Sequence, residues 1–271
     1  MPHRDLVRTL TPLLRDVAGE AGAMARAYFR RGQKTGARIW SKAGGSPVTE
    51  ADVQVDAFLK ARLSRALPEA GWLSEETADD AARLDRRLVW IVDPIDGTRA
   101  FLNGHPDWSV AIGLLMDGEP VLGVVHAPAL NALYAASAGG GATLNGQPIA
   151  ASPRRALAGA ITTGPKPLVD RLQRGAADLV AAEKIPSLAL RIARVAEGSI
   201  DLGLVSSNAR DWDIAAADLL LREAGGRLTG LDGAPPRYNR PDPVHGEMLA
   251  APAALHASAL EALSDHPQAA H

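Results

Sequence analysis

The chain has 271 residues, 46 % of them hydrophobic, and a net charge of −2. This composition predicts a globular protein with a substantial core, and the interspersed charge argues against a nucleic-acid coat or membrane-surface protein. The absence of cysteine excludes disulfides, thiolate zinc sites and cysteine nucleophiles. The sequence shows neither the apolar core of a signal peptide nor a stretch that could span a bilayer, so we expect a cytoplasmic protein without membrane insertion.

Two amphipathic helices are expected first. Apolar residues recur at helical spacing from Leu6 to Met24, and Thr11-Pro12 marks a place where this helix starts or bends. A flexible stretch at 41–47 precedes a second helix with an apolar face from Val55 to Leu67. Strands are then expected near 72–73, 88–92, 110–116, 121–126, 133–136 and 142–144, with turn signals at 117–120 and 145–146.

From about residue 151 the pattern changes to alternating strands and helices. Strands are expected near 158–162, 200–205 and 247–250, and helices near 167–182, 187–197 and 212–224. We therefore predict an N-terminal part, 1–150, of helices and a largely antiparallel sheet, and a smaller C-terminal α/β part, 151–271. The tail after about Ser264 is expected to fray.

The most informative segment is the run WIVDPIDGT at residues 90–98. An apolar strand leads into Asp93, Pro94 blocks continuation of the strand ladder, Gly97 frees the backbone, and Thr98 can open a helix. Carboxylates at the end of a strand are well placed to bind hard cations, and amides at a helix start are well placed to bind phosphate. This segment offers both halves of a metal-dependent phosphatase site.

Acidic residues gather in four places along the chain: Asp52, Glu75-Glu76, Asp93 with Asp96, and Asp211 with Asp213. Carboxylates that converge on one point repel one another unless cations are present, and magnesium suits an all-oxygen set. Two such ions could activate a water and stabilise a leaving oxygen.

Taken singly, these residues have ordinary structural interpretations as turns, helix caps or solvated loops. The same holds for other conspicuous side chains. Lys42, Arg99 and Arg210 are expected to face solvent. Core or structural roles are expected for Trp90, Trp108, Trp212, His105 and His126.

Together, the separated segments resemble the inositol monophosphatase superfamily of lithium-sensitive, magnesium-dependent phosphatases. Residues 90–98 resemble its first signature, and 211–217 followed by 223–226 resemble its second. Residues 74–76 match the family's acidic segment, and 46–52 match the start of a helix. The resemblance covers about residues 5–250. It implies an α+β fold, a layered αβαβα sandwich in which the C-terminal part supplies Asp213 to a site in the N-terminal part.

The resemblance also implies a metal-ligand set. Glu75, Asp93 and the carbonyl of Ile95 would hold a first magnesium ion, and Asp93, Asp96 and Asp213 a second. Glu75 and water would hold a third ion loosely. Glu75 is therefore expected to be a metal ligand and also a catalytic residue.

The remaining roles concern the phosphate and the attacking water. The amides of Gly97 and Thr98 would cradle the phosphate at the helix start. Thr98, hydrogen-bonded to Asp52, would help deprotonate the metal-bound water for in-line attack on phosphorus. Asp213 is also expected to contact the substrate. The metal ion that it holds would stabilise the departing alkoxide.

We expect the substrate to be a small-molecule phosphate ester rather than a nucleic-acid polymer. Segments 46–49, 73–76 and 123–131 resemble bacterial 3'(2'),5'-bisphosphate nucleotidases, so adenosine 3',5'-bisphosphate is favoured. Inositol-specific members carry a glutamate where Ser206 stands here, which weakens inositol monophosphate as the alternative. Histidinol phosphate is a third candidate. We place Ser206 and Arg210 at the substrate, with Arg210 meeting a second phosphate. The family includes dimers and monomers, and a homodimer is compatible with this sequence.

Two other classes of protein share some of these features but explain fewer of them. Haloacid-dehalogenase phosphatases use the first aspartate of Asp-x-Asp-Gly-Thr as a nucleophile, but here two residues, Pro94 and Ile95, separate the aspartates, and Glu75 and Asp213 would be unexplained. A pseudophosphatase that binds metal or nucleotide would be expected to lack a ligand or the activating pair, and none is missing.

Overall fold

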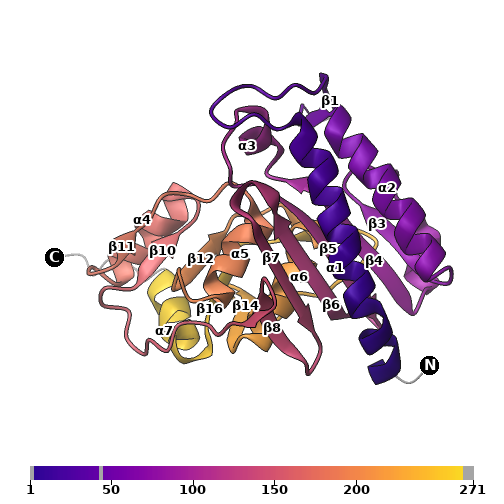
Figure 1. Cartoon of the computed structure of the whole chain (residues 1–271). Helices are drawn as coiled ribbons and strands as arrows, with labels where there is room; N and C mark the ends of the chain where they lie inside the picture. Colours follow the sequence, from indigo (N-terminus) through magenta and orange to yellow (C-terminus); the bar gives the residue numbers. More distant parts are fainter. Residues whose placement is uncertain (1–2, 43–44, 265–271) are drawn as a thin grey trace.

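A computed structural model of the chain describes residues 3–42 and 45–264, which form alternating layers of helices and sheets (Figure 1). Helices α1 and α2 cover one face of a seven-stranded sheet, and α5 and α6 lie between this sheet and a five-stranded one. Helices α4 and α7 cover the far face of the second sheet. The predicted α+β fold with αβαβα layers is therefore confirmed. Its helices are α1 (His3–Tyr28), α2 (Glu50–Ala66), α3 (Thr98–Leu102), α4 (Lys166–Gly175), α5 (Leu188–Ala196), α6 (Asp211–Glu223) and α7 (Ala253–Leu263).

The first sheet has the strand order β3-β4-β5-β6-β7-β8-β9. Its strands are β3 (Gly71–Ser74), β4 (Leu88–Asp96), β5 (Ser109–Met116), β6 (Glu119–Ala127), β7 (Ala132–Ser137), β8 (Gly141–Leu144) and β9 (Gln147–Pro148). All neighbours are antiparallel except β3 and β4, which are parallel. The expected meander of hairpins is present, since turns connect β5 through β9 in order.

The second sheet mixes parallel and antiparallel pairs in the order β11-β10-β12-β16-β14. Its strands are β10 (Ile161–Thr163), β11 (Val180–Ala181), β12 (Leu202–Val205), β14 (Gly226–Gly230) and β16 (Met248–Pro252). Two small pairs complete the strands: β1 (Ile39–Ser41) with β2 (Pro47–Thr49), and β13 (Ala209–Arg210) with β15 (Val244–His245). Strand β14 and helix α7 have no counterpart among the predicted elements.

Three local expectations at the helices and the first loop compare with the structure as follows. Helix α1 does not start at Thr11-Pro12, because it begins at His3 and contains Pro12; the Thr11 hydroxyl donates to the Val7 carbonyl at 2.7 Å. A bend at this position stays a prediction. The two ends of the stretch expected to be flexible, Ser41 and Pro47, are cross-strand partners in the β1–β2 pair. The helix expected at 167–182 ends at Gly175, which packs against the backbone of Ala262, and residues 180–181 instead form a strand parallel to β10.

Strand β4 does not stop at Asp93 as its proline suggested. The pairing with β5 is interrupted between Asp93 and Asp96, where Pro94 lies, and resumes at Asp96, which pairs with Ser109. Gly97 follows with a φ of +88° and caps α3. The irregular end of β4 therefore turns two aspartates and the start of a helix toward one place.

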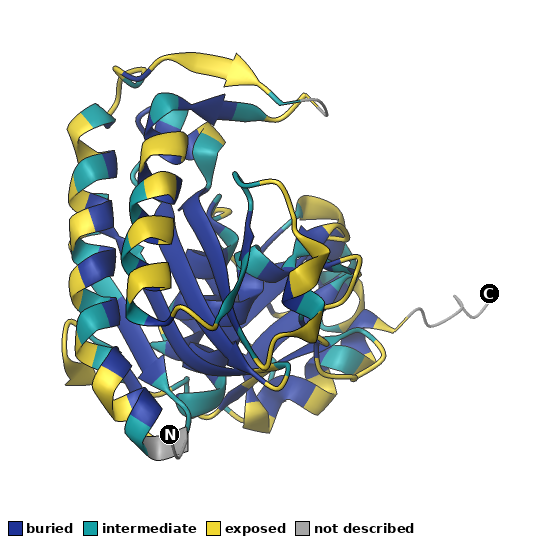
Figure 2. Cartoon of the chain, turned by 90° about the vertical axis from the view of Figure 1, so that its right-hand side faces the viewer, coloured by how far each residue is buried: buried dark blue, intermediate teal, exposed yellow. Residues whose placement is uncertain are grey.

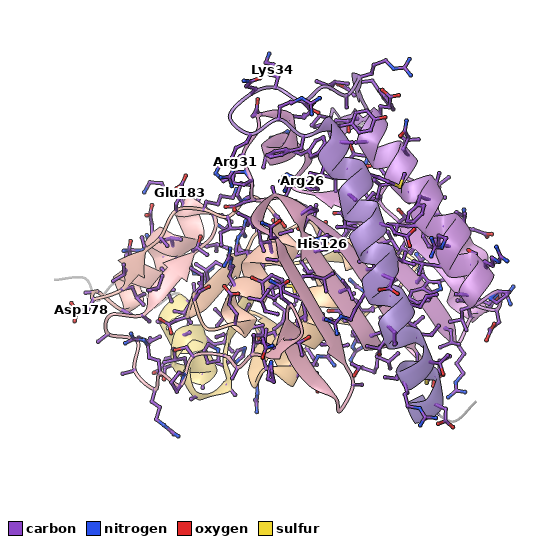
Figure 3. All side chains as sticks on the ribbon, in the orientation of Figure 1. Arg26, Arg31, Lys34, His126, Asp178 and Glu183 are labelled. Carbon is purple, nitrogen blue, oxygen red and sulfur yellow. The ribbon has the colours of Figure 1, made fainter. Side chains whose placement is uncertain are left out.

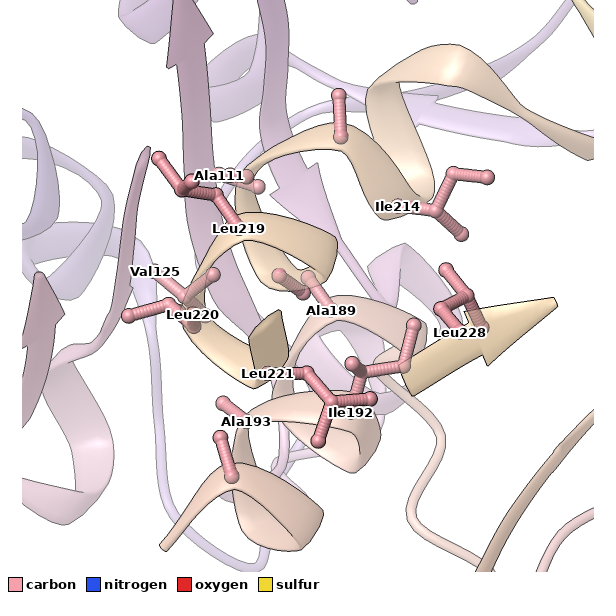
Figure 4. Packing of buried hydrophobic residues seen from close by; sticks show 14 of the residues in the cluster. Ala111, Val125, Ala189, Ile192, Ala193, Ile214, Leu219, Leu220, Leu221 and Leu228 are labelled. Carbon is pink, nitrogen blue, oxygen red and sulfur yellow. The ribbon is translucent and has the colours of Figure 1, made fainter. Parts of the chain in front are cut away.

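The layers are held together by apolar packing on both faces of the first sheet. Helices α1 and α2 turn their buried faces to it and leave their outer faces to solvent (Figure 2). On the other face, α6 presents Leu219 and Leu220 toward Ala111 and Val125 of the sheet, and the second sheet contributes Leu228 (Figure 4). One apolar cluster contains residues of both sheets, and α6 contacts β4 of the first sheet.

The division into parts 1–150 and 151–271 stays a prediction. All strands of the first sheet precede residue 150, and the second sheet follows it. The frayed tail predicted after Ser264 falls outside the described residues. Within the described ranges, no helix combines the length and apolar character that a bilayer crossing requires.

Candidate metal and phosphate site

Three aspartates from the two halves of the chain converge at the end of β4. Asp93 and Asp96 belong to β4, and Asp213 lies in the first turn of α6. One carboxylate oxygen from each lies within 4.8 Å of the others. The sequence separates Asp96 from Asp213 by more than a hundred residues, so this cluster exists only because α6 packs behind the first sheet.

Each of the three carboxylates is oriented by hydrogen bonds. The Ile95 amide donates to Oδ1 of Asp93 at 3.0 Å, and the Arg210 amide donates to Oδ2 of Asp213 at 2.7 Å. Oδ2 of Asp96 accepts from the Ser187 hydroxyl at 2.5 Å and from the Ala189 amide at 2.7 Å. These bonds hold the carboxylates together despite their like charge.

Burial and mutual repulsion make this cluster costly without a cation. Asp93 and Asp96 are buried, and Asp213 is half-buried. Burial, followed by the charges of Glu75 and Asp96, raises the pKa of Asp93 well above its ordinary value. Burial, followed by the charge of Asp96, does the same for Asp213. Burial raises the pKa of Asp96 to about 6. A set of oxygen donors with these properties fits a hard divalent cation.

Glu75 and Glu76 follow strand β3 outside this group of three aspartates, and the charge of Glu75 acts on Asp93 and Asp213. Lys42, expected to face solvent, instead places its ammonium 2.9 Å from Oε1 of Glu75 and 2.7 Å from Oε1 of Glu76. Burial raises the pKa of Glu76 to about 7 even though Lys42 favours its charged form. Lys42 thus already supplies one positive charge at the edge of the acidic site.

A second polar group forms where α2 and α3 begin. Asp52 is buried, and its Oδ2 accepts from the amide of Thr49 at 2.8 Å and from the Thr49 hydroxyl at 2.5 Å. Its Oδ1 lies 3.5 Å from the hydroxyl of Thr98, which also lies 3.1 Å from the carbonyl oxygen of Ile95. Burial raises the pKa of Asp52 to about 6. A carboxyl group with this pKa is suited to proton exchange near neutrality.

The carboxylates and the start of α3 line one cavity of about 320 Å³. Glu75, the three aspartates, Gly97 and Thr98 line it, together with Ser46 and Pro47 of the β1–β2 hairpin. Arg99, Lys184 and Pro186 complete its rim. The first-turn amides of a helix lack intrahelical partners, so the start of α3 offers donors for a phosphate beside the metal cluster.

Ser206 and Arg210 do not line this cavity. Ser206 is exposed in the turn after β12. The Arg210 guanidinium packs 5.6 Å from the ring of Trp212 and lies 4.0 Å from Asp242. Their predicted contacts with substrate remain predictions.

The histidines and tryptophans show the structural roles expected of them. Trp90 and Trp108 are buried in the core, and Trp212 is partly buried against it. His126 lies between β6 and α1 (Figure 3), where its Nδ1 is 2.9 Å from the carbonyl oxygen of Ala18. His105 lies in the loop after α3, where its Nδ1 accepts a hydrogen bond from the amide of Asp107.

Ser187 and Lys184 were missed by the sequence reasoning. Ser187 caps α5 by accepting from the amide of Leu190 at 3.1 Å, and a serine just before an apolar helical pattern is a recognisable cap. Its contact with Asp96, 91 residues away, has no local signal. Lys184 stands in an irregular loop, where a lysine is ordinary.

Comparison with known proteins places this geometry in a family. The sequence matches the inositol monophosphatase family over residues 6–268. An inositol-1-monophosphatase of Mesorhizobium japonicum is 35 % identical over 74 % of this chain and 79 % of its own length. A histidinol-phosphatase of Mycobacterium tuberculosis is 35 % identical over 86 % and 90 %. A 3'(2'),5'-bisphosphate nucleotidase of Aggregatibacter actinomycetemcomitans is 32 % identical over 85 % and 88 %.

Solved structures agree with this assignment. The extragenic suppressor protein suhB of Bartonella henselae superposes with a TM-score of 0.83 at 28 % identity, over 95 % of this chain and 99 % of that one. The chain belongs to the inositol monophosphatase family, and it is a metal-dependent phosphoric monoester hydrolase that acts on a small phosphate ester. The similar relatives carry three different substrate names at nearly equal identity, so similarity alone does not choose among the substrates.

Proposed function

We propose that this protein is a Mg²⁺-dependent phosphomonoesterase that uses two or three ions and prefers adenosine 3',5'-bisphosphate. The meeting of Asp93, Asp96 and Asp213 within 4.8 Å carries the metal part of the proposal. Together with Glu75 and the carbonyl of Ile95 they form an all-oxygen donor set, which suits magnesium better than softer metals. When bound, the ions supply the positive charge that acidifies a water and stabilises the reacting phosphate.

The residues of the chain bind the phosphate and move one proton. The amides at the start of α3, from Gly97 and Thr98, hold phosphate oxygens beside the acidic cluster. The Thr98 hydroxyl accepts the proton of the attacking water and passes its own proton to Asp52, 3.5 Å away. Asp52 takes this role because burial has raised its pKa to about 6.

Two basic side chains at the cavity support a substrate with a second anionic group. Arg99 follows the phosphate-binding turn, and Lys184 lies in the loop before α5; both are exposed and both line the cavity. Among the residues that the structure describes, neither forms an ion pair. Positive charge beyond the metal ions is not needed to hold one phosphate, whereas it matches the 5'-phosphate of a bisphosphate nucleotide.

The same charges disfavour histidinol phosphate. Its leaving alcohol carries an amine that is protonated at neutral pH, which Arg99 and Lys184 would repel. Inositol is neutral and gains nothing from them, and Ser206 replaces the glutamate that the resemblance associates with inositol hydroxyls. The rim charges and this substitution therefore favour the nucleotide.

A phosphate-release comparison tests the proposal. Purified protein with Mg²⁺ is given adenosine 3',5'-bisphosphate, inositol 1-phosphate and histidinol phosphate at matched concentrations. We expect the highest kcat/KM for the bisphosphate. A higher kcat/KM for either of the other esters would overturn the substrate proposal while leaving the family assignment intact.

Charge-removing variants sharpen the same test. Arg99→Met and Lys184→Met should each raise KM for the bisphosphate about tenfold, the effect of one charge-assisted contact, with little change for inositol 1-phosphate. Arg65→Met is the matched control, because Arg65 is also exposed but lies in the last turn of α2, far from the cavity. Equal losses for both substrates would show that the two cations do not select a second phosphate.

A further inference from the structure

Asp96 is held by a chain of hydroxyl groups that crosses between the two halves of the protein. Ser109 begins β5 and is the cross-strand partner of Asp96, whereas Ser187 caps α5 in the C-terminal part. The hydroxyl oxygens of Ser109 and Ser187 lie 3.0 Å apart, and Ser187 lies 2.5 Å from Oδ2 of Asp96. Both serines are fully buried.

The direction of each hydrogen bond follows from counting donors and acceptors. A serine hydroxyl has one proton and can accept two hydrogen bonds. The Ser187 hydroxyl donates its hydrogen bond to Asp96, and its oxygen accepts a hydrogen bond from the amide of Leu190 at 3.1 Å. The bond between the two serines therefore has Ser109 as its donor. The hydroxyl of Ser187 makes all three of its hydrogen bonds, so its orientation is fixed.

The same count fixes which oxygen of Asp96 faces a metal. Oδ2 accepts from the hydroxyl of Ser187 and, at 2.7 Å, from the amide of Ala189. A carboxylate oxygen has two lone pairs, and both are then in use. Only Oδ1 remains available to a cation. Asp96 would therefore bind a cation through Oδ1, and its hydrogen bonds with Ser187 and Ala189 orient its carboxylate group.

We infer that Ser187, oriented by Ser109, is a positioning residue that sets the metal affinity of the Asp96 site. The inference rests on the proposed role of Asp96 as a ligand. Hydrogen-bond partners of metal ligands commonly change metal affinity by about 10–100-fold when they are removed. The backbone of Ser187 also packs against Gly97, where an added Cβ would lie 3.2 Å from its amide nitrogen. Because residue 97 is a glycine, Ser187 can pack directly against the turn that follows Asp96.

Titration of the protein with Mn²⁺ alone, followed by electron paramagnetic resonance, tests the inference without substrate. Ser187→Gly removes the hydroxyl but keeps a residue that is acceptable at a helix N-cap. We expect its Mn²⁺ dissociation constant to rise about 10–100-fold. Ser187→Thr, which retains the hydroxyl, should restore much of the affinity. Ser109→Ala should weaken binding less, because it removes only the group that orients Ser187.

Two controls separate the possible outcomes. Asp96→Asn should lose Mn²⁺ affinity; if it binds as the wild type does, Asp96 is not a ligand and that part of the proposed function fails. If Asp96→Asn loses affinity while Ser187→Gly and Ser109→Ala bind normally, only the positioning inference is overturned. Thermal unfolding of each variant reports the separate cost of the lost helix cap, and Ser109→Ala keeps the test valid if Ser187→Gly does not fold.

Discussion

The hydroxyl oxygen of Thr98 lies 3.5 Å from Oδ1 of Asp52. This contact joins the first turn of α3 to the first turn of α2, so two helix starts meet at the cavity. The other oxygen of Asp52 is occupied by Thr49, which leaves Oδ1 as the only one directed at Thr98. The pair lies next to the acidic cluster but does not belong to it, and in the proposed function it transfers the proton of the attacking water.

Removing the Thr98 hydroxyl should slow the reaction without weakening metal binding. Thr98→Val keeps the side-chain shape and should lower kcat by about 10²–10⁴-fold, the usual contribution of a positioned proton-transfer group. The Mg²⁺ concentration for half-maximal rate should stay within about twofold. Thr98→Ser should retain most of the activity. An equal loss in Ser and Val variants would indicate that the threonine methyl, not the hydroxyl, matters.

Neutralising Asp93 should separate activity from stability. Asp93→Asn should abolish phosphate release, because Asp93 is expected to be a ligand of both principal ions. In the absence of metal the same variant should unfold at a higher temperature than the wild type, since it removes a charge from a buried, repelling cluster. Phosphate release and thermal unfolding in chelator measure the two effects. Retained activity would refute the metal assignment.

The metal-free protein should lose stability as pH rises from about 4 to 7. Burial raises the pKa of Asp52 and of Asp96 to about 6, and that of Glu76 to about 7. Carboxyl groups with a raised pKa in the folded state favour folding when protonated, so their contribution is full below the ordinary pKa and disappears above the folded one. Thermal unfolding in chelator at about pH 5 and pH 7.5 measures this loss.

The Asp96→Asn variant isolates the contribution of this carboxyl group to the pH dependence of stability. Such a variant is needed because buried histidines change stability in the opposite direction as pH rises. Burial lowers the pKa of His126 and of His256, so these residues destabilise the fold when acid protonates them. Asp96→Asn keeps both histidines unchanged and should show a smaller loss of stability between the two pH values than the wild type. Saturating Mg²⁺ should reverse the trend in the wild type, since metal ligands bind in their deprotonated form. The same pH dependence in variant and wild type would contradict the expected role of Asp96.

Gly97→Ala should cost more than backbone strain alone. Gly97 has a φ of +88°, and an added Cβ would lie 3.1 Å from the carbonyl of Asp107 and 3.2 Å from the amide of Ser187. Gly118 is the matched control, with a φ of +81° and open space around its Cβ position. Gly118→Ala should destabilise by about 1–2 kcal/mol, whereas Gly97→Ala should lose more and should also lose activity. Similar unfolding temperatures for both variants would contradict this expectation.

The sequence predicts the local parts of the site well and its long-range contacts poorly. The run 88–98 predicts a strand, a turn and a helix start because each step has its own residue signal. The contact of Ser187 with Asp96 depends on how α5 packs in the folded chain. The ion pairs of Lys42 depend on the β1–β2 hairpin, whose sequence has no clear apolar alternation to predict it. Helix α4 ends at Gly175, close to the backbone of α7, and only the folded chain brings these two segments together.

The most direct test of the proposed metal centre is anomalous X-ray diffraction from crystals of the protein soaked in Mn²⁺. We predict a strong anomalous peak between the carboxylates of Asp93, Asp96 and Asp213, with Asp96 coordinating through Oδ1 alone. The absence of a peak there at a Mn²⁺ concentration that supports phosphate release, or a peak bound only by other residues, would contradict the proposed site.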